Sequence, residues 1–306
     1  MAQAFQGPRP CAREASGSSR PAMDEAPARP LRAVRVILGH LAPVRLRVAL
    51  PEEPGDRSWT GGTLWPSGLA LADWLARQPL PGPLAGARVL ELGCGIAPLA
   101  SAVAAHRGAE AVVASDGDTT AVRTAEANLR QCVGASAGAA AAAGCLRVER
   151  LGWEQARSSV PAGTFDVVLF ADGVYTEAAA LALAECADHC LAAGPAARIY
   201  GVVPDERVGA AELCRELRRR SFAAKELDLG PSAQADVTAV EAFEGCSREE
   251  ALQKGSCKLV QWRRCGPSPG EEDDGRRLER HFDGAVAAAE RALLARLEAA
   301  GYEPGE

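Results

Sequence analysis

Short apolar segments alternate with longer segments of helical periodicity through the middle of the chain, and this alternation is the strongest constraint on its fold. The short segments are typical of buried strands and lie at residues 88–92, 111–115, 146–151, 165–171, 197–203, 225–229 and 257–263. The helical segments lie at residues 65–77, 98–106, 119–132, 177–192 and 208–220. Strands that alternate with helices form right-handed βαβ crossovers and a mostly parallel sheet. The sequence therefore predicts an α/β fold with a doubly wound, mostly parallel, seven-stranded sheet of the Rossmann-like kind.

Composition divides the chain into three parts. Residues 1–30 are rich in Ala, Pro, Arg and Ser without any period, which indicates a disordered leader; early arginines leave an organellar transit peptide as the alternative. Residues 31–265 hold the predicted domain. Residues 266–306 combine an acidic linker with an added C-terminal helix from residue 276 to 300. We expect this helix to be dispensable for the fold.

Two features flank or interrupt the alternation inside the domain. Alternating apolar residues at 34–38 and 44–50, joined by a turn that contains Gly and Pro, predict a β-hairpin before the first parallel strand. An Ala- and Gly-rich stretch at 134–144 predicts a loop insertion between a helix and the next strand.

Charge and hydropathy limit the classes of partner. The chain has 34 basic and 40 acidic residues, a net charge of −6, so the broad positive surface of a nucleic-acid-binding protein is not expected. No apolar run approaches the roughly 20 residues that cross a bilayer, so no membrane partner is expected. We expect a monomer.

Ten cysteines occur without any C-x-x-C spacing. Cys186 and Cys190 with His189 give only a weak metal signal, because a structural zinc site needs four ligands. We predict free thiols, no metal site and a reducing compartment, hence a cytoplasmic protein, with the nucleus or an organelle as alternatives that depend on the leader.

A glycine loop at the end of the first parallel strand is the strongest functional signal. The stretch contains Glu91, Gly93, Cys94 and Gly95, and small residues there let a ligand approach the next helix. A dinucleotide site requires a small residue where Pro98 stands. Glu91 suits a ligand with a positive amino group better than one with a pyrophosphate. These features favour S-adenosylmethionine over a dinucleotide.

Three further side chains are candidates for cofactor contact. Asp116 ends the second strand, where a carboxylate can accept both ribose hydroxyls; the alternative is that it caps the next helix, a role open also to Asp118 or Thr119. Trp153 follows the third strand and can stack on or flank an adenine. Trp65 opens the helix that precedes the glycine loop.

The strand at 165–171 ends with Ala171, followed by Asp172 and, three residues later, Tyr175. A carboxylate and a phenol at a strand end can position an amine in line with a methyl donor. Methyltransferases for exocyclic base amines or glutamine have an Asn- or Asp-Pro-Pro-Tyr here, and Gly173 and Val174 replace both prolines.

Together these motifs resemble methyltransferase family 16, the seven-β-strand protein-lysine methyltransferases, over about residues 34–264. The resemblance rests on the Trp-led helix Gly-Thr-Leu-Trp-Pro-Ser-Gly-Leu, the Glu-Leu-Gly-Cys-Gly loop, Leu-Gly-Trp and the Asp-x-x-Tyr signature. It implies lysine in a substrate protein near Asp172 and Tyr175. It also implies contact with S-adenosylmethionine by Trp65, Gly93, Cys94, Gly95, Asp116, Trp153 and Ala171.

The substrate stays open at this level. Ala97 stands where the family often has Gly, and Gly152 where it often has Asp, but neither change removes a predicted cofactor group. Members of such a family also modify arginine or histidine. A small-molecule methyltransferase and a non-catalytic, cofactor-binding interaction protein remain alternatives, since specificity resides in loops.

Overall fold

The computed structural model describes residues 31–36, 44–49, 60–62, 64–133, 145–229, 240–241, 257–264 and 271–299. The leader at 1–30, the insertion at 134–144 and the first half of the acidic linker, at 266–270, lie outside these residues. Among the described helices none is long and apolar enough to cross a membrane.

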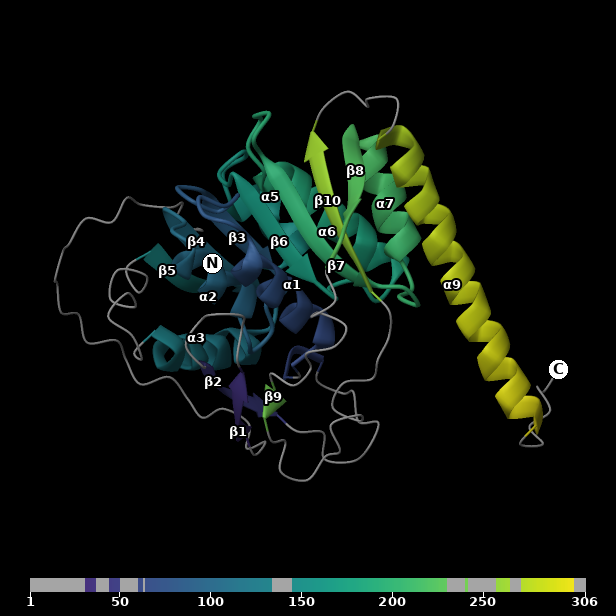
Figure 1. Cartoon of the computed structure of the whole chain (residues 1–306), viewed down its shortest axis with the longest axis horizontal. Coiled ribbons are helices and arrows are strands. Elements are labelled where there is room, and N and C mark those ends of the chain that lie inside the picture. The colour runs from purple at the N-terminus through teal and green to yellow at the C-terminus, as the bar shows by residue number, and fades with distance from the viewer. Residues whose placement is uncertain are drawn as a thin grey trace, which may run out of the picture.

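A seven-stranded sheet forms the centre of the molecule, in the order β5-β4-β3-β6-β7-β10-β8 (Figure 1). Its strands are β3 (Arg88–Leu92), β4 (Ala111–Asp116), β5 (Leu146–Arg150), β6 (Val167–Ala171), β7 (Arg198–Pro204), β8 (Phe222–Leu227) and β10 (Cys257–Arg264). The first five in the sheet are parallel, and β10 runs antiparallel between β7 and β8. The predicted doubly wound, mostly parallel sheet is confirmed.

Helices cover both faces of the sheet, as the strands' two-sided apolar pattern requires. One face carries α1 (Pro66–Arg77), α2 (Leu99–His106) and α3 (Thr119–Val133), and the other α6 (Glu177–Cys190), α7 (Ala210–Arg219) and α9 (Glu271–Ala299). Two hydrophobic cores result. The first core lies between the sheet and α1 and α2, and the second core lies between the sheet and α6, α7 and α9. Successive residues of one strand point into different cores: Val89 packs in the first core and Leu90 in the second. Three short turns, η1 (Thr60–Gly62), η2 (Trp153–Gln155) and α5 (Ala156–Ser159), lie near strand ends.

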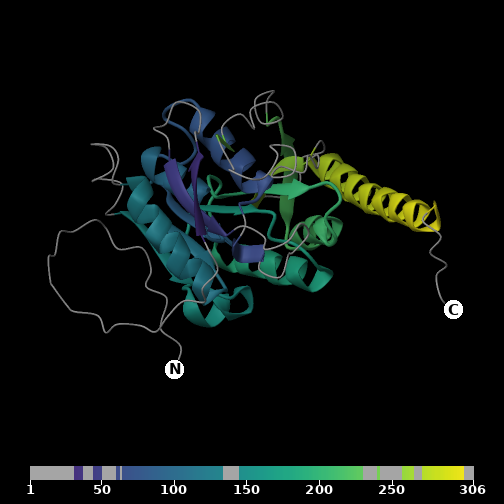
Figure 2. The same ribbon diagram turned by 90° about the horizontal axis from the view of Figure 1, so that it is seen from below.

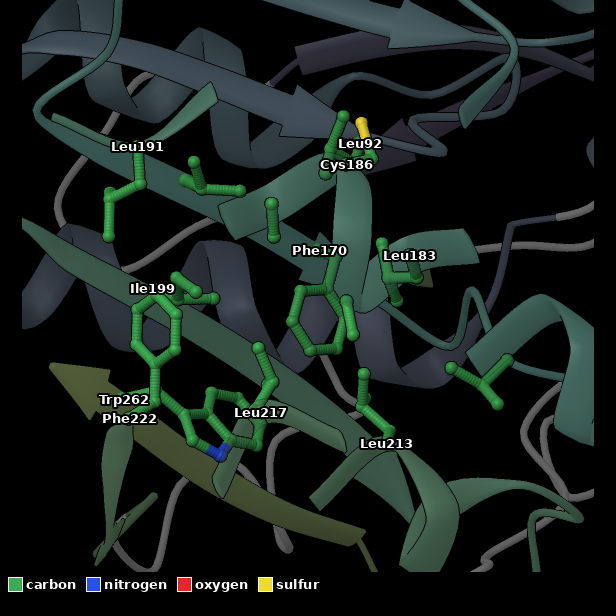
Figure 3. Close-up of a cluster of buried hydrophobic side chains, with 14 of the residues drawn as sticks. Leu92, Phe170, Leu183, Cys186, Leu191, Ile199, Leu213, Leu217, Phe222 and Trp262 are labelled. Atoms are coloured by element: carbon green, nitrogen blue, oxygen red, sulfur yellow. The ribbon is translucent and has the colours of Figure 1, made fainter. Parts of the chain in front are cut away.

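The second core is built around two stacked rings. Phe170 of β6 and Trp262 of β10 lie with ring centroids 5.6 Å apart, among leucines of α6 and α7 (Figure 3). Gly201 of the neighbouring strand makes room for Phe170, since a Cβ there would lie 2.2 Å from the ring. This packing fixes β6, whose end carries the candidate catalytic residues, against β7.

The packing of the C-terminal helix argues against the expectation that it is dispensable. The helix begins at Glu271, inside the segment expected to be linker, and its first half lies along α7 and β8. Leu278 and Phe282 are 1% and 0% exposed within the second core, and Arg218 forms two hydrogen bonds, of 2.8 and 3.1 Å, with Glu279. Only the outer half, with Leu293 and Leu294, projects from the body.

A second, small sheet confirms the predicted hairpin. Strands β1 (Leu31–Val36) and β2 (Val44–Ala49) are antiparallel, and β9 (Val240–Glu241) adds a third strand beside β1. Strand β2 lies against α3, so this sheet sits over one helical layer (Figure 2).

Cys94, Cys186, Cys190, Cys214 and Cys257 form no disulfide. Cys186 and Cys190 are buried in α6, and the neighbouring His189 interacts through Nε2 with the carbonyl oxygen of Val160 at 2.7 Å. In the described part of the chain no three His, Cys, Asp or Glu side chains come together as metal ligands would.

Candidate active site

A cavity of about 340 Å³ opens at the carboxyl ends of the central strands. In open α/β sheets this edge is where ligands bind. Every residue that the sequence analysis assigned to the cofactor lines it: Trp65, Glu91, Gly93, Cys94, Gly95, Asp116, Trp153 and Ala171. Tyr175 also borders the cavity, whereas Asp172 is buried and is not one of the lining residues.

The glycine loop holds its shape through backbone contacts that side chains would block. Gly93 and Gly95 have φ angles of 69° and 56°, in the left-handed region that favours glycine. A Cβ at Gly95 would lie 3.0 Å from the carbonyl oxygen of Gly61, which itself accepts a hydrogen bond from Ile96 at 2.9 Å. The turn η1 therefore lies directly on the loop. Burial raises the pKa of the Cys94 thiol, so it contributes here as a small apolar residue.

Glu91 is a buried acid at the base of the cavity. It is 6% exposed, and its Oε2 accepts a hydrogen bond from the backbone N–H of Ser101 at 2.8 Å. Burial raises its pKa to about 7, against the opposing effect of the Ser101 hydrogen bonds. The carboxyl group is therefore poised between its neutral and charged forms at neutral pH.

Asp116 and Asp118 divide the two roles that the sequence left open. Oδ1 of Asp118 accepts hydrogen bonds from the N–H groups of Thr120 and Ala121, so Asp118 caps α3. Asp116 instead faces the loop: its Oδ2 accepts from Gly95 and its Oδ1 from Asp118, both at 2.9 Å. Burial raises the pKa of Asp116. The carboxylate of Asp116 therefore borders the cavity and does not cap the N-terminus of α3.

Trp153 forms one wall of the cavity from η2. Its ring lies so close to two glycines that a Cβ would be 3.3 Å away at Gly93 and 3.2 Å away at Gly173. These glycines, one after β3 and one after β6, let the six-membered ring of the indole approach two strand ends closely. Sequence analysis named Trp153 and Gly173 separately and did not predict that this glycine accommodates the ring.

Asp172 departs from what the sequence suggested. Its side chain is 3% exposed, and Oδ1 forms an ion pair with Nη2 of Arg207 at 2.6 Å. Its φ of 52° lies in the left-handed region, which costs free energy for residues other than glycine and often marks functional sites. The carboxylate is therefore engaged by an internal cation in this structure.

Arg207 is a charged residue of this site that sequence analysis did not name. Its guanidinium carbon lies 5.1 Å from the ring centroid of Tyr175 and 5.8 Å from that of Trp65. Two aromatic rings and one carboxylate thus surround one cation. Arg207 lies in the loop after β7 and belongs to no sequence motif. Its proximity to Asp172 follows from the position of β7 beside β6 in the sheet.

The chemistry of the cavity lining fits S-adenosylmethionine. Glu91, Asp116 and Asp118 supply three carboxyl groups, and no basic residue occurs among the described lining residues. A pyrophosphate would meet negative charge there, whereas a ligand with an ammonium group and ribose hydroxyls would meet acceptors. The flat wall of Trp153 suits a purine ring.

Comparison with known proteins gives the family. The profile of the lysine methyltransferase family matches residues 47–208, more than half of the chain. No curated protein matches in a sequence search.

Similar solved structures include magnesium protoporphyrin IX methyltransferase from Synechocystis PCC 6803 with bound S-adenosylmethionine (17% identity, 65% of this chain and 78% of that chain, TM-score 0.43). A putative S-adenosylmethionine-dependent methyltransferase from Streptococcus mutans is also similar (13% identity, 80% of this chain and 57% of that chain, TM-score 0.48). On the strength of the profile match, this chain belongs to the lysine methyltransferase family and is an S-adenosylmethionine-dependent methyltransferase.

Proposed function

We propose that this enzyme methylates a lysine side chain of a protein, with Asp172 and Tyr175 placing the amine. The observation that carries the proposal is the position of the Arg207 guanidinium, held by Asp172 between the rings of Tyr175 and Trp65. A place beside the cavity that accommodates one cationic nitrogen group is suited to the ammonium group of an incoming lysine.

We assign the cavity residues to the cofactor by their chemistry. Asp116 accepts the ribose hydroxyls, Trp153 contacts the adenine and Glu91 faces the amino group. The backbone of Gly93, Cys94 and Gly95 allows close approach, and Trp65 and Ala171 contact the cofactor, as the family resemblance implies. When bound, S-adenosylmethionine supplies an electrophilic methyl group.

The acceptor side must present a neutral amine. A free lysine has a pKa near 10.4, and its ammonium form is no nucleophile. Burial between Trp65 and Tyr175 lowers the pKa of such a group, while the Asp172 carboxylate opposes this by stabilising the cation. Asp172 therefore captures and orients the side chain, Tyr175 restricts its approach, and the proton leaves to water. We further propose that the protein is a monomer. We also propose that it is cytoplasmic, because its cysteine content suits a reducing compartment.

One labelling experiment tests this function. The protein is incubated with methyl-labelled S-adenosylmethionine and a whole-cell lysate, and the labelled band is analysed by mass spectrometry. We expect methyl-lysine in a protein, and an approximately 10²-fold lower rate for Asp172→Asn at similar cofactor affinity, the scale of a lost positioning group. The control is Asp283→Asn, an exposed carboxylate that pairs with Arg215 on α7. Label on a small metabolite, on arginine or on histidine would refute the proposal.

A further inference from the structure

We infer that Arg207 occupies the acceptor site in the absence of substrate, and that a cationic substrate side chain must displace it from Asp172. This inference rests on the proposed function, because it concerns the same acceptor site. It makes Arg207 a specificity-determining residue, since an acceptor without positive charge has nothing to exchange for the guanidinium.

The geometry shows one cation site with one occupant. Nη2 of Arg207 lies 2.6 Å from Oδ1 of Asp172, and the guanidinium carbon lies within 6 Å of the centroids of both Tyr175 and Trp65. Trp65 and Tyr175 also line the cavity that we assign to the cofactor, so the guanidinium lies beside residues of that cavity. On the proposed function, a lysine bound at Asp172 would lie beside the same two rings.

Two cations cannot share this carboxylate at low cost. The side chain of Asp172 is 3% exposed, so the field of any charge beside it is weakly screened. A second positive group would gain attraction from Asp172 but would be repelled by Arg207 at similar distance. The favourable outcome is exchange, in which the incoming ammonium takes the place of the guanidinium and Arg207 moves to solvent.

The surroundings of Arg207 make its departure feasible. Its side chain is 20% exposed, and its Nε is buried without a hydrogen-bond acceptor in the described part of the chain. An unmade buried hydrogen bond costs free energy, which reaching water would recover. The backbone is fixed independently, because Arg207 donates to Pro204 and accepts from Ala210. Rotation of the side chain alone can therefore empty the site.

A binding experiment without methyl transfer tests this exchange. The probe is n-butylammonium, which carries the end of a lysine side chain, and 1-butanol is the neutral control. Ligand-observed NMR measures both affinities for wild type, Arg207→Gln and Arg207→Lys. If Arg207 fills the site nine-tenths of the time, Arg207→Gln should bind n-butylammonium about tenfold more tightly, because apparent affinity scales with the fraction of competent sites. Arg207→Lys, which keeps a cation, and 1-butanol should show no gain.

Two further variants locate the effect. Adding Asp172→Asn to Arg207→Gln should abolish the gain, because the carboxylate is the shared partner. The matched control is Arg157→Gln, whose guanidinium pairs with Glu185 on the outer side of α6 and should leave affinity unchanged. Equal n-butylammonium affinity in wild type and Arg207→Gln, or a gain that survives Asp172→Asn, overturns the inference.

A measurement on the wild-type protein covers the case in which Arg207→Gln does not fold. The Nε resonance of Arg207, assigned in ¹⁵N-labelled protein, should shift on saturation with n-butylammonium and stay in place with 1-butanol. No shift at saturation counts against exchange. The lysate experiment has an independent outcome. Label on a small metabolite would refute the proposed function but would not contradict cation exchange at Asp172.

Discussion

The carboxylate of Glu91 accepts a hydrogen bond from the backbone N–H of Ser101, with 2.8 Å between Oε2 and the nitrogen. This contact ties the end of β3 to the first turn of α2, where backbone N–H groups lack intrahelical acceptors. Glu91 thus supports the glycine loop from below as well as bordering the cavity. A buried acid with both functions should make stability and cofactor affinity depend on pH.

Stability should depend on pH through Glu91 with a defined sign. Its pKa is about 7 in the folded protein, above the ordinary value of 4.5, so the folded state binds more protons between these limits. The contribution of Glu91 to the free energy of unfolding is therefore lost as the pH rises from 4.5 through 7. Glu91→Gln, which keeps an acceptor for Ser101, should be more stable relative to wild type at pH 8 than at pH 5. Urea denaturation at both pH values measures this, and a difference of opposite sign would contradict it.

Cofactor binding should depend on the same group. An ammonium group beside Glu91 favours its charged form, so binding near pH 6.5 should release protons and weaken as the pH falls below about 7. Calorimetry in buffers of different ionisation enthalpy counts these protons. Glu91→Gln should abolish the release, and equal proton release in the variant would exclude Glu91 as its source.

Asp116 and Asp118 should separate cofactor affinity from stability. Asp116→Ala should weaken S-adenosylhomocysteine binding by roughly 1.5–3 kcal/mol, as for a lost hydrogen bond to a charged group. Asp118→Ala removes the cap of α3 and should lower the free energy of unfolding by about 1 kcal/mol, with a smaller effect on affinity. For both variants, calorimetry measures the affinity for S-adenosylhomocysteine and urea denaturation measures the free energy of unfolding. Unchanged affinity in Asp116→Ala would refute the ribose assignment.

Much of the fold and cavity could be predicted because their signals are local. Strand and helix periodicity predicts a parallel sheet, and parallel strands present their carboxyl ends at one edge. Asp116, which ends β4, and Trp153, which follows β5, were therefore expected to lie at the same edge of the sheet.

Contacts between distant segments could not be predicted in this way. The ion pair of Arg207 with Asp172 joins two loops 35 positions apart, and no motif marks Arg207. The hydrogen bond of Glu91 with Ser101 depends on how α2 is placed over β3. The burial of Phe282 depends on which surface α9 meets, whereas the apolar spacing of a helix shows only that one side is apolar.

The width of the cavity at Trp153 should be sensitive to one methyl group. Gly173→Ala places a Cβ 3.2 Å from the indole, tighter than ordinary van der Waals contact, so the ring must shift. Because Trp153 forms one wall of the cavity, we expect weaker S-adenosylhomocysteine binding, measured by calorimetry. Gly284→Ala in α9, where a Cβ would meet nothing within 4 Å, is the control and should leave affinity unchanged. Equal affinities for both variants would show that Trp153 does not contact the cofactor.

The two halves of α9 should differ in their effect on stability. Leu278 is 1% exposed in the second core and Leu294 is 54% exposed on the projecting half of the same helix. Leu278→Ala should lower the free energy of unfolding by about 2–5 kcal/mol, through lost burial and the cavity left behind. Leu294→Ala is the matched control, with the same substitution in the same helix, and should change stability by less than about 0.5 kcal/mol.

Truncation extends the same argument to the whole helix. The described side chains at 290–296 and 299 are exposed, so removing residues 290–306 should leave urea denaturation nearly unchanged. Removing residues 266–306 also removes Leu278, Phe282 and the pairing of Glu279 with Arg218, and exposes apolar surface of α7 and β8. This variant should be strongly destabilised or fail to fold. If both truncated proteins unfold at the urea concentration of wild type, α9 is an accessory to the domain and not part of its core.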